Sequence, residues 1–487
     1  MVLKPSRDIV AGFLTVRSQS CAHDATQMNK FDRGRKSATA AMAAFASGLV
    51  FDDIPVDVIE KVKLCLLDTI GCCIYGSTLP FMKALISMAL TEGGTPAAAI
   101  LGTSHRTSAS QAALVNGTAA HAFQLDEVHA GATLHPGSVV VPAVLALSNG
   151  ARLSGRDFLT AMIAGYEVGI RIGLAADGGM FKRGYHNQGT TGALAAAAAA
   201  ARALGLDPRA TAQALGIAAS QSAGLMAVQE GANAKAFHSG RAAQSGVYAA
   251  LLAGDGFTGA EDVLDVEYGG FFSTLVDGFK PERLTEDLGR EWETRKVGYK
   301  LSPASNGSIT AMDTLSRIMK GNVVKAEDIE HITAYVSTNT LHHCGWDFDP
   351  RRVKGVLGAQ MNLRYGLAVM ALDGRATPAQ YTEKRVSDPK IAEFLAKIDV
   401  RVCDEFDRDS ALRLASRLEA RSSGGETYVD QTLYRKGSAE DPVSAMQLED
   451  KFLTLTAEIL PAQSARTCIE QIRTLDALPR VPEFGSI

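Results

Sequence analysis

The stretch Val58-Ile-Glu-Lys-Val-Lys-Leu-Cys-Leu-Leu-Asp-Thr-Ile70 places apolar side chains at positions 58, 59, 62, 65, 66 and 70. This spacing of three and four residues lines one face of a helix. Pro55 comes just before the stretch, where a first helical turn tolerates proline. The stretch therefore predicts a helix with one buried side.

Helix signals continue from about Ser37 to Phe279. Ser154-x-x-Asp157 forms a capping pattern before the apolar stripe that begins at Phe158. Asp207-Pro208 is a cap followed by a first-turn proline. Residues 193–206 are mostly alanine, which indicates a tightly packed core helix. We expect no membrane span, because no run approaches the ~18 consecutive strongly apolar residues that a span requires.

The pattern changes near residues 296–302. Apolar and polar side chains then alternate, as is typical of strands, in residues 329–336, 398–402 and 427–433. Helical spacing is found between and after them, in residues 360–372, 389–396, 448–459 and 465–475. Helices mixed with three short strands predict a small α+β domain.

We therefore expect a mainly α protein with a large all-helical domain and a smaller α+β lid domain inserted before the C-terminal helices. The predicted segments are a disordered N-terminal extension at 1–37, a helical domain at 38–298, an α+β lid at 299–441 and C-terminal helices at 442–487 that return to the helical domain.

Composition excludes some classes of protein. The 487 residues are 46% hydrophobic and 21% charged with a formal net charge of −4, so no basic surface for nucleic acid is expected. The seven cysteines contain no Cys-x-x-Cys pair, which favours reduced, buried thiols over an iron–sulfur cluster. Because acidic residues are interspersed among the basic residues of the first 37 positions, we expect a cytoplasmic protein, with a mitochondrial one as the alternative.

Candidate chemistry lies in three Gly-rich segments, residues 121–138, 182–192 and 231–243, which together hold His121, His129, His135, His186, His238 and Lys235. Each segment lies at a predicted helix boundary, where loop amides can bind carboxylates. Lysine and arginine neutralise carboxylates, and histidine exchanges protons near neutral pH. The three segments therefore suit an enzyme that acts on a carboxylate.

Other kinds of site are less well supported. Asp126, Glu127, His129 and His135 form a possible metal-ligand set, but they share one segment without the i, i+4 spacing of a zinc-protease helix. His342-His343-Cys344 is a second superficial metal candidate, which we interpret as a loop after a strand. No Gly-x-Ser-x-Gly elbow or dinucleotide-binding fingerprint follows a predicted strand. We therefore expect no metal and no nucleotide cofactor.

The segments together resemble the MmgE/PrpD family, which includes 2-methylcitrate dehydratases, cis-aconitate decarboxylases and an iminodisuccinate epimerase. The resemblance runs from about Ala38 to Leu475, and its motifs are residues 67–73, 116–129, 135–138, 165–173, 184–192 and 235–243. Within the family the sequence is most similar to the fungal type of cis-aconitate decarboxylase, through residues 225–226, 268–271, 343–346 and 358–361.

The resemblance implies a homodimer without metal or organic cofactor, and a site at the junction of helical domain and lid. The catalytic residues that it implies are His135, His186, Lys235, Asp126 and His129. The substrate-binding residues that it implies are His238, Arg241, Gln124, Val128, Lys300 and Ile309.

The chain departs from the family where the lid begins. A Lys-x-Tyr-x-x-Cys-x-x-x-His pattern is usual there, and this sequence retains Lys300 but has Ser302, Ser305 and Ile309 in place of the tyrosine, cysteine and histidine. Isoleucine neither donates a proton nor binds a carboxylate. Ile309 and Val128 therefore predict a pocket more apolar than those of relatives.

The expected reaction is the cofactor-independent loss of CO₂ from a small polycarboxylate such as cis-aconitate. Lys235 and His186 would hold carboxylates, and His135 would protonate the carbon skeleton as general acid. The alternatives are a 2-methylcitrate-type dehydratase, an isomerase or epimerase that acts on a less charged acid, and a degenerate dimeric binding protein. No nucleic-acid or membrane partner is expected.

Overall fold

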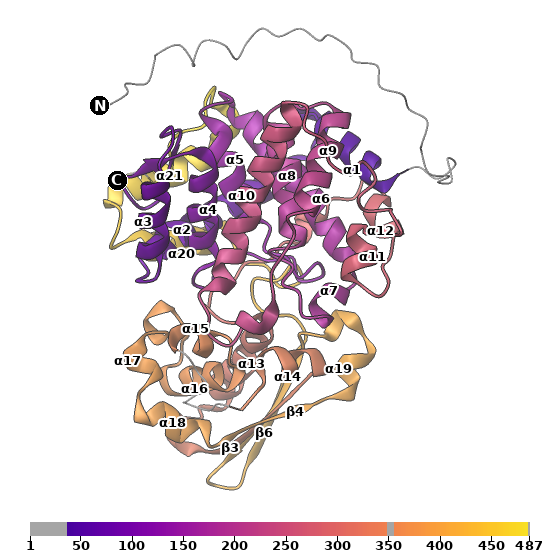
Figure 1. Ribbon diagram of the computed structural model, residues 1–487. Coiled ribbons are helices and arrows are strands. Elements are labelled where there is room, and N and C mark those ends of the chain that lie inside the picture. Colours follow the sequence, from indigo (N-terminus) through magenta and orange to yellow (C-terminus); the bar gives the residue numbers. More distant parts are fainter. Residues whose placement is uncertain (1–36, 348–354, 486–487) are drawn as a thin grey trace, which may run out of the picture. The chain divides into compact units, whose positions relative to one another are not determined.

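The computed structural model describes residues 37–347 and 355–485, so residues 1–36 of the predicted N-terminal extension lie outside the described residues. The described chain is mainly α with a small α+β portion, as predicted. In Figure 1 the indigo-to-magenta helices pack together, and the orange segment contains the four-stranded sheet. We call residues 299–441 the lid, and the remaining described residues the helical body.

The helical body is built mostly from helices of the first 285 residues, joined by two from the C-terminus. The helices are α1 Ala38–Gly48, α2 Val56–Ser77, α3 Met82–Glu92, α4 Ala109–His121, α5 Gly137–Ser148, α6 Gly155–Ala175, α7 Gly179–Lys182, α8 Thr191–Ala203, α9 Pro208–Ala219, α10 Ala234–Gly254, α11 Phe271–Leu275, α12 Glu282–Thr285, α20 Ala445–Thr456 and α21 Ala462–Arg473. Shorter elements are the 3₁₀ turns η2 Phe51–Asp53, η3 Met226–Val228, η4 Glu293–Lys296 and η8 Leu475–Ala477, and the two-residue strands β1 Ala98–Ala99 and β2 Arg106–Thr107.

Local sequence accounts for several of these helices. The stretch 58–70 lies inside α2 and buries its apolar stripe. The Ser154 side chain accepts a hydrogen bond from the Asp157 amide at 3.1 Å, and thereby caps α6. The Asp207 carboxylate accepts one from the Ala210 amide at 2.8 Å ahead of α9. The predicted caps at Ser154 and Asp207 are therefore confirmed.

The alanine-rich helix α8 lies at the centre of the helical body. Its residues from Ala193 to Ala201 are completely buried. A Cβ atom at Gly169 of α6 would lie 2.4 Å from the Ala195 Cβ, and one at Gly246 of α10 would lie 2.4 Å from the Ala196 Cβ. Only glycine permits such close contact, so these two positions allow α6 and α10 to pack directly on α8.

One described helix is long and apolar enough to cross a membrane. This helix is α6, but 94% of its apolar window is buried inside the protein. The bent pair α2 and α3 passes the same test only if the two helices are taken together. Core helices of proteins without a membrane span are buried in the same way. The apolar composition of α6 is therefore explained by its packing against α8.

The lid combines short helices with one sheet. Its helices are α13 Asn306–Asn322, α14 Thr338–Cys344, α15 Gly355–Gln360, α16 Leu363–Asp373, α17 Glu383–Val386, α18 Pro389–Leu395 and α19 Asp404–Arg408. Its strands are β3 Ile329–Val336, β4 Ile398–Val402, β5 Ser416–Ser422 and β6 Thr427–Thr432, and its 3₁₀ turns are η5 Ala326–Asp328, η6 Pro378–Gln380 and η7 Ser410–Leu412. The sheet order is β4-β3-β5-β6, with β3 parallel to β4 and the other pairs antiparallel.

Two details of the lid differ from the sequence prediction. Strand β5 was not predicted, because its inward positions hold Ser416, Leu418, Ala420 and Ser422, of which only Leu418 is strongly apolar. The prediction of a loop at residues 342–344 is wrong, because these residues form the last part of helix α14. The Ser337 side chain caps that helix by accepting a hydrogen bond from the Thr340 amide at 3.1 Å.

After the lid the chain packs again on the helical body, because α20 lies against α2. Phe452 of α20 contacts Gly71, where an added Cβ would lie 3.0 Å from its ring. The described cysteines are free, as predicted, and all except Cys403 are buried. Cys21 lies outside the described residues.

Candidate active site

A cavity of about 110 Å³ lies between the helical body and the lid. We call it the active-site cavity. The predicted site residues that line it are Gln124, Val128, His135, His186, Lys235 and Lys300. The lid adds Ser305, Asn306 and Gly307 from the start of α13, Asn339, Thr340 and His343 from α14, and Arg413.

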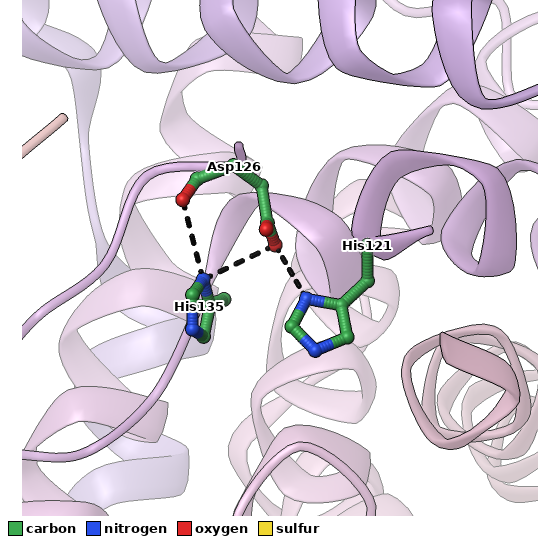
Figure 2. A group of neighbouring side chains, drawn as sticks. All are labelled: His121, Asp126 and His135. Atoms are coloured by element: carbon green, nitrogen blue, oxygen red, sulfur yellow. Dashed lines mark hydrogen bonds and ion pairs between the residues drawn. The ribbon is translucent and has the colours of Figure 1, made fainter. Parts of the chain in front are cut away.

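Asp126 joins two histidines at the wall of this cavity. Its Oδ2 atom lies 2.8 Å from His121 Nδ1 and 3.2 Å from His135 Nδ1. Figure 2 shows the carboxylate between the two imidazole rings, with a further contact of 3.3 Å from His135 Nδ1 to the Asp126 carbonyl. Both His121 and Asp126 are completely buried. Asp126 therefore fixes the orientation of both rings and leaves Nε2 of each free of the carboxylate.

The backbone on either side of Asp126 is held in place by hydrogen bonds to side chains of α2 and α20. The Leu125 carbonyl accepts a hydrogen bond from Lys451 of α20 at 2.6 Å, and the Glu127 amide donates to Asp68 Oδ2 at 3.0 Å. Lys451 also forms an ion pair with Asp68 Oδ1 at 2.6 Å. This clamp connects α2, α20 and the Asp126 loop, so the C-terminal helices help to position the site.

Gln124 holds both lysines of the cavity. Its φ of 59° turns the chain sharply after α4. Its side-chain Oε1 accepts a hydrogen bond from Lys235 Nζ at 2.8 Å, and its carbonyl accepts one from Lys300 Nζ at 3.2 Å. Lys235 Nζ also lies 3.3 Å from His121 Nε2. Both ammonium groups are thus buried against neutral partners.

His186 forms a second histidine pair with His238. Their Nδ1 atoms lie 2.9 Å apart, so one ring donates to the other. The His186 ring also lies beside that of His121, with centroids 5.7 Å apart. His186 lines the cavity, whereas His238, which was also predicted to bind substrate, does not.

The electrostatics of the cavity favour neutral histidines. Burial lowers the pKa of His121 to about 3 and also lowers the pKa of His135 and His186. Burial, together with nearby Lys300, lowers the pKa of Lys235 to about 7. Burial acts to raise the pKa of Asp126, but the two histidines hold it well below its usual range. A bound anion would counteract the depressed pKa values and favour protonated lysine and histidine.

Besides His238, the predicted site residues His129, Arg241 and Ile309 do not line the cavity. The side chain of His129 faces Glu293, with 3.3 Å between Nε2 and Oε2, because the loop turns it outward from His135. Arg241 is exposed and donates a hydrogen bond to Gln244 on its own helix. Ile309 is buried in a hydrophobic cluster of lid residues that also includes Phe123 and Leu125 of the helical body, and it does not line the cavity. Of the two residues expected to make the pocket more apolar, Val128 therefore lines the cavity and Ile309 does not.

Sequence reasoning missed three residues of the site. The sequence assigns His121 no role of its own; the signal that marks it is its position at the end of a helix, five residues before Asp126. His343 was assigned to a loop, yet it lines the cavity and lies 3.1 Å from Gln229 through Nδ1. Arg413 precedes the unpredicted strand β5, and no local signal marked it.

His121, Asp126 and His135 could also hold a metal ion, since one ligand atom from each lies within 4.8 Å of the others. The four-residue ligand set considered from sequence is not assembled, because His129 faces Glu293 and Glu127 accepts a hydrogen bond from the Tyr166 hydroxyl at 2.6 Å. The Nδ1 atoms of both histidines already point at one carboxylate oxygen. The geometry is that of a hydrogen-bonded triad.

The chain is similar to known protein domains and to several known proteins. The MmgE/PrpD N-terminal domain matches residues 40–284, and the MmgE/PrpD C-terminal domain matches residues 302–477. A cis-aconitate decarboxylase of Aspergillus terreus is 30% identical over 472 residues, which cover 93% of this chain and 96% of the relative. A cis-aconitate decarboxylase-like protein of Aspergillus oryzae is 31% identical over 465 residues, covering 92% and 96%.

The similarity extends beyond fungi. The cis-aconitate decarboxylase of Homo sapiens is 27% identical over 455 residues, covering 91% of this chain and 92% of the relative. These relatives support a lyase-type enzyme. Two domain matches that together span most of the described residues, and relatives aligned along nearly their whole length, show that this chain belongs to the MmgE/PrpD family.

Proposed function

We propose that this protein is a cofactor-independent carboxy-lyase that decarboxylates cis-aconitate or a closely similar tricarboxylate. One observation carries the proposal: the active-site cavity holds three cationic side chains, Lys235, Lys300 and Arg413, and none forms an ion pair with a carboxylate of the described residues. Buried charges are costly without a counter-charge. A trianionic substrate would supply one carboxylate to each cation.

The triad provides the acid for this reaction. In cis-aconitate the bond between the methylene carbon and its carboxylate breaks, and CO₂ leaves. The released electron pair forms a new methylene double bond, while the old double bond shifts its electrons onto the carbon beside another carboxylate. His135 donates a proton from Nε2 to that carbon, and itaconate results. Asp126, at Nδ1, stabilises the imidazolium form that donates.

Charge placement favours this step. As CO₂ leaves, negative charge spreads onto the remaining carboxylate as an enediolate. Lys235 and Lys300 are fixed by Gln124 before substrate arrives, so little reorganisation is needed. The bound carboxylates also surround His135 with negative charge, which offsets the effect of burial on its pKa.

The direct test is proton NMR of the purified protein with cis-aconitate in D₂O. We expect itaconate with one deuterium in the methylene group beside the carboxylate. His135→Ala should remain folded and form no itaconate. Deuterium exchange into substrate without product would instead indicate an isomerase, and no labelling at all, with a folded protein, would indicate a binding protein.

A dehydratase is the second candidate, because His135 and His186, each held by a different partner, line one cavity. His135, oriented by Asp126, and His186, paired with His238, could act as base and acid on a hydroxylated substrate. The same NMR experiment with 2-methylcitrate tests this: formation of an unsaturated tricarboxylate, with cis-aconitate left unchanged, would favour dehydration.

We also propose that the chain forms a homodimer through α10. Phe237, Tyr248, Leu251 and Leu252 of that helix are each 37–40% exposed, and helical spacing places them on one face. Light scattering after size-exclusion chromatography should give twice the chain mass for the wild type. Tyr248→Asp should give the monomer mass, and an unchanged dimer would place the interface elsewhere.

A further inference from the structure

A second cavity of about 380 Å³ adjoins the active-site cavity. The two cavities share Val128, Ala130, Arg413 and Leu414 in their walls. A solute in the second cavity is therefore separated from the active site only by these side chains. Nothing in the proposed reaction makes use of this second space.

Arg435 is a buried cation at the wall of the second cavity. It is only 5% exposed, and its guanidinium donates to Asn306 Oδ1 at 3.0 Å, to the Lys436 carbonyl at 3.0 Å and to the Tyr299 carbonyl. All three acceptors are neutral. Among the described residues no carboxylate pairs with it, and burial lowers its pKa to about 10. A buried guanidinium that contacts only neutral acceptors favours an anion beside it.

Arg413 contributes a second unpaired guanidinium. Its side chain reaches from the lid to the Ala130 carbonyl, in the loop between Asp126 and His135. Its own carbonyl accepts hydrogen bonds from the Ser337 and Thr340 hydroxyls at 2.6 and 3.0 Å, which anchor its backbone to α14. Arg413 thus lies at the boundary of both cavities with a neutral partner only.

The lysines of the second cavity already have counter-charges. Lys280 pairs with Asp177 at 2.8 Å, and Lys296 pairs with Glu293 at 2.9 Å. Glu440 also lines the cavity; it forms no ion pair with either arginine, but its charge, like that of Asp313, acts on Arg435 from a greater distance. Arg283, which also lines the cavity, pairs with Glu286 at 3.8 Å. Arg413 and Arg435 are therefore the lysine or arginine side chains of this cavity that form no ion pair among the described residues, and they face the same space.

We propose that the second cavity is a binding site for a carboxylate ligand, held by Arg413 and Arg435, where the polycarboxylate substrate waits before it enters the active site. The identity of the ligand rests on the proposed function, whereas the anion site itself does not. Arg413 can exchange its bond to Ala130 for a bond to the arriving carboxylate. It then presents that carboxylate to Lys235 and Lys300 on the other side of the shared wall.

Calorimetric titration with tricarballylate, a saturated tricarboxylate that cannot decarboxylate, tests the site. We expect two molecules bound per wild-type chain at low ionic strength. Arg435→Gln should bind one, and Arg435→Lys, which keeps the charge, should retain two. Arg466→Gln is the matched control, because it removes the same charge from an exposed position on α21.

Kinetics with cis-aconitate provide a second readout. At low salt Arg435→Gln should lower kcat/KM by about tenfold with little change in kcat, since steering by fixed charge acts on association. Added salt should reduce the difference from wild type, because it screens that charge. Arg466→Gln should match wild type throughout.

The outcomes separate this inference from the proposed function. A stoichiometry of one or none for the wild-type chain overturns the second site, whatever the variants do and even if Arg435→Gln does not fold. Two bound tricarballylates in a protein that leaves cis-aconitate unchanged would keep the second site and reject the proposed reaction. Turnover of cis-aconitate by a protein that binds only one tricarballylate would support the proposed reaction and reject the second site.

Discussion

Lys451→Met removes the centre of the clamp behind the Asp126 loop. The Lys451 side chain is 8% exposed and that of Asp68 is fully buried, and both contacts of Lys451, to Asp68 and to the Leu125 carbonyl, measure 2.6 Å. Methionine fills similar space but leaves the Asp68 carboxylate without its cation. Breaking a buried ion pair from one side costs about 3–5 kcal/mol, so we expect a loss of that size in the free energy of unfolding.

The pH dependence of the loss has a definite sign. Burial already raises the pKa of Asp68, and Lys451 opposes this. Without Lys451 the pKa rises further. A carboxyl whose pKa is higher in the folded state destabilises the fold when it is ionised, and this cost disappears as pH falls toward the pKa of the unfolded state. The difference between wild type and Lys451→Met should therefore shrink at lower pH.

Guanidinium unfolding followed by circular dichroism measures the effect. Asp68→Asn/Lys451→Met should lose less stability than Lys451→Met alone, because no unpaired charge remains. Arg295→Met is the control, since its partner Asp57 is exposed, and it should cost no more than about 1 kcal/mol. A similarly small loss for Lys451→Met, or a double variant that equals the sum of its singles, would refute the reasoning.

Three further predictions concern the site. The kcat/KM for a polycarboxylate should fall as pH rises above about 7, because Lys235, with a pKa of about 7 in the empty cavity, then loses the charge that binds carboxylate; a flat profile from pH 6 to 8 would contradict this. Dialysis against EDTA should leave turnover unchanged if His121, Asp126 and His135 act as a hydrogen-bonded triad, whereas loss of activity that zinc restores would establish a metal site. Gly307→Ala should lower the melting temperature, since the new Cβ would lie 2.6 Å from Thr340 Cγ2, and Thr340→Ala in the same chain should recover part of the loss.

Much of the fold follows from local pattern. The helical spacing in residues 58–70, the caps at Ser154 and Asp207 and the alternation in residues 329–336 each reflect interactions within a few residues. Strand β5 shows the limit of such reasoning. Its inward side chains are small or polar, and it is a strand because β3 and β6 pair with it on both sides.

The candidate site, like the fold, was predictable from sequence only in part. The resemblance to the family implied roles for Asp126, His135, His186 and Lys235, and groups of this kind near helix ends also suit carboxylate chemistry. Which of their neighbours share the cavity was decided by packing. Ile309 follows Ser305 by one helical turn, yet Ser305 lines the cavity while Ile309 is buried in the hydrophobic cluster.

The sequence by itself determined the family, the helical character and the chemical types available to the site. Only the tertiary structure decided that His121 shares Asp126 with His135, that Arg413 and His343 reach the cavity from the lid, and that Lys451 supports the loop from the C-terminus. The physical reason is distance along the chain. Periodicity reports which face of an element is apolar, but not which distant element covers that face. The contacts of His343, Arg413 and Lys451 join residues 114, 283 and 326 positions apart, and the irregular loop that joins His121, Asp126 and His135 has no periodicity.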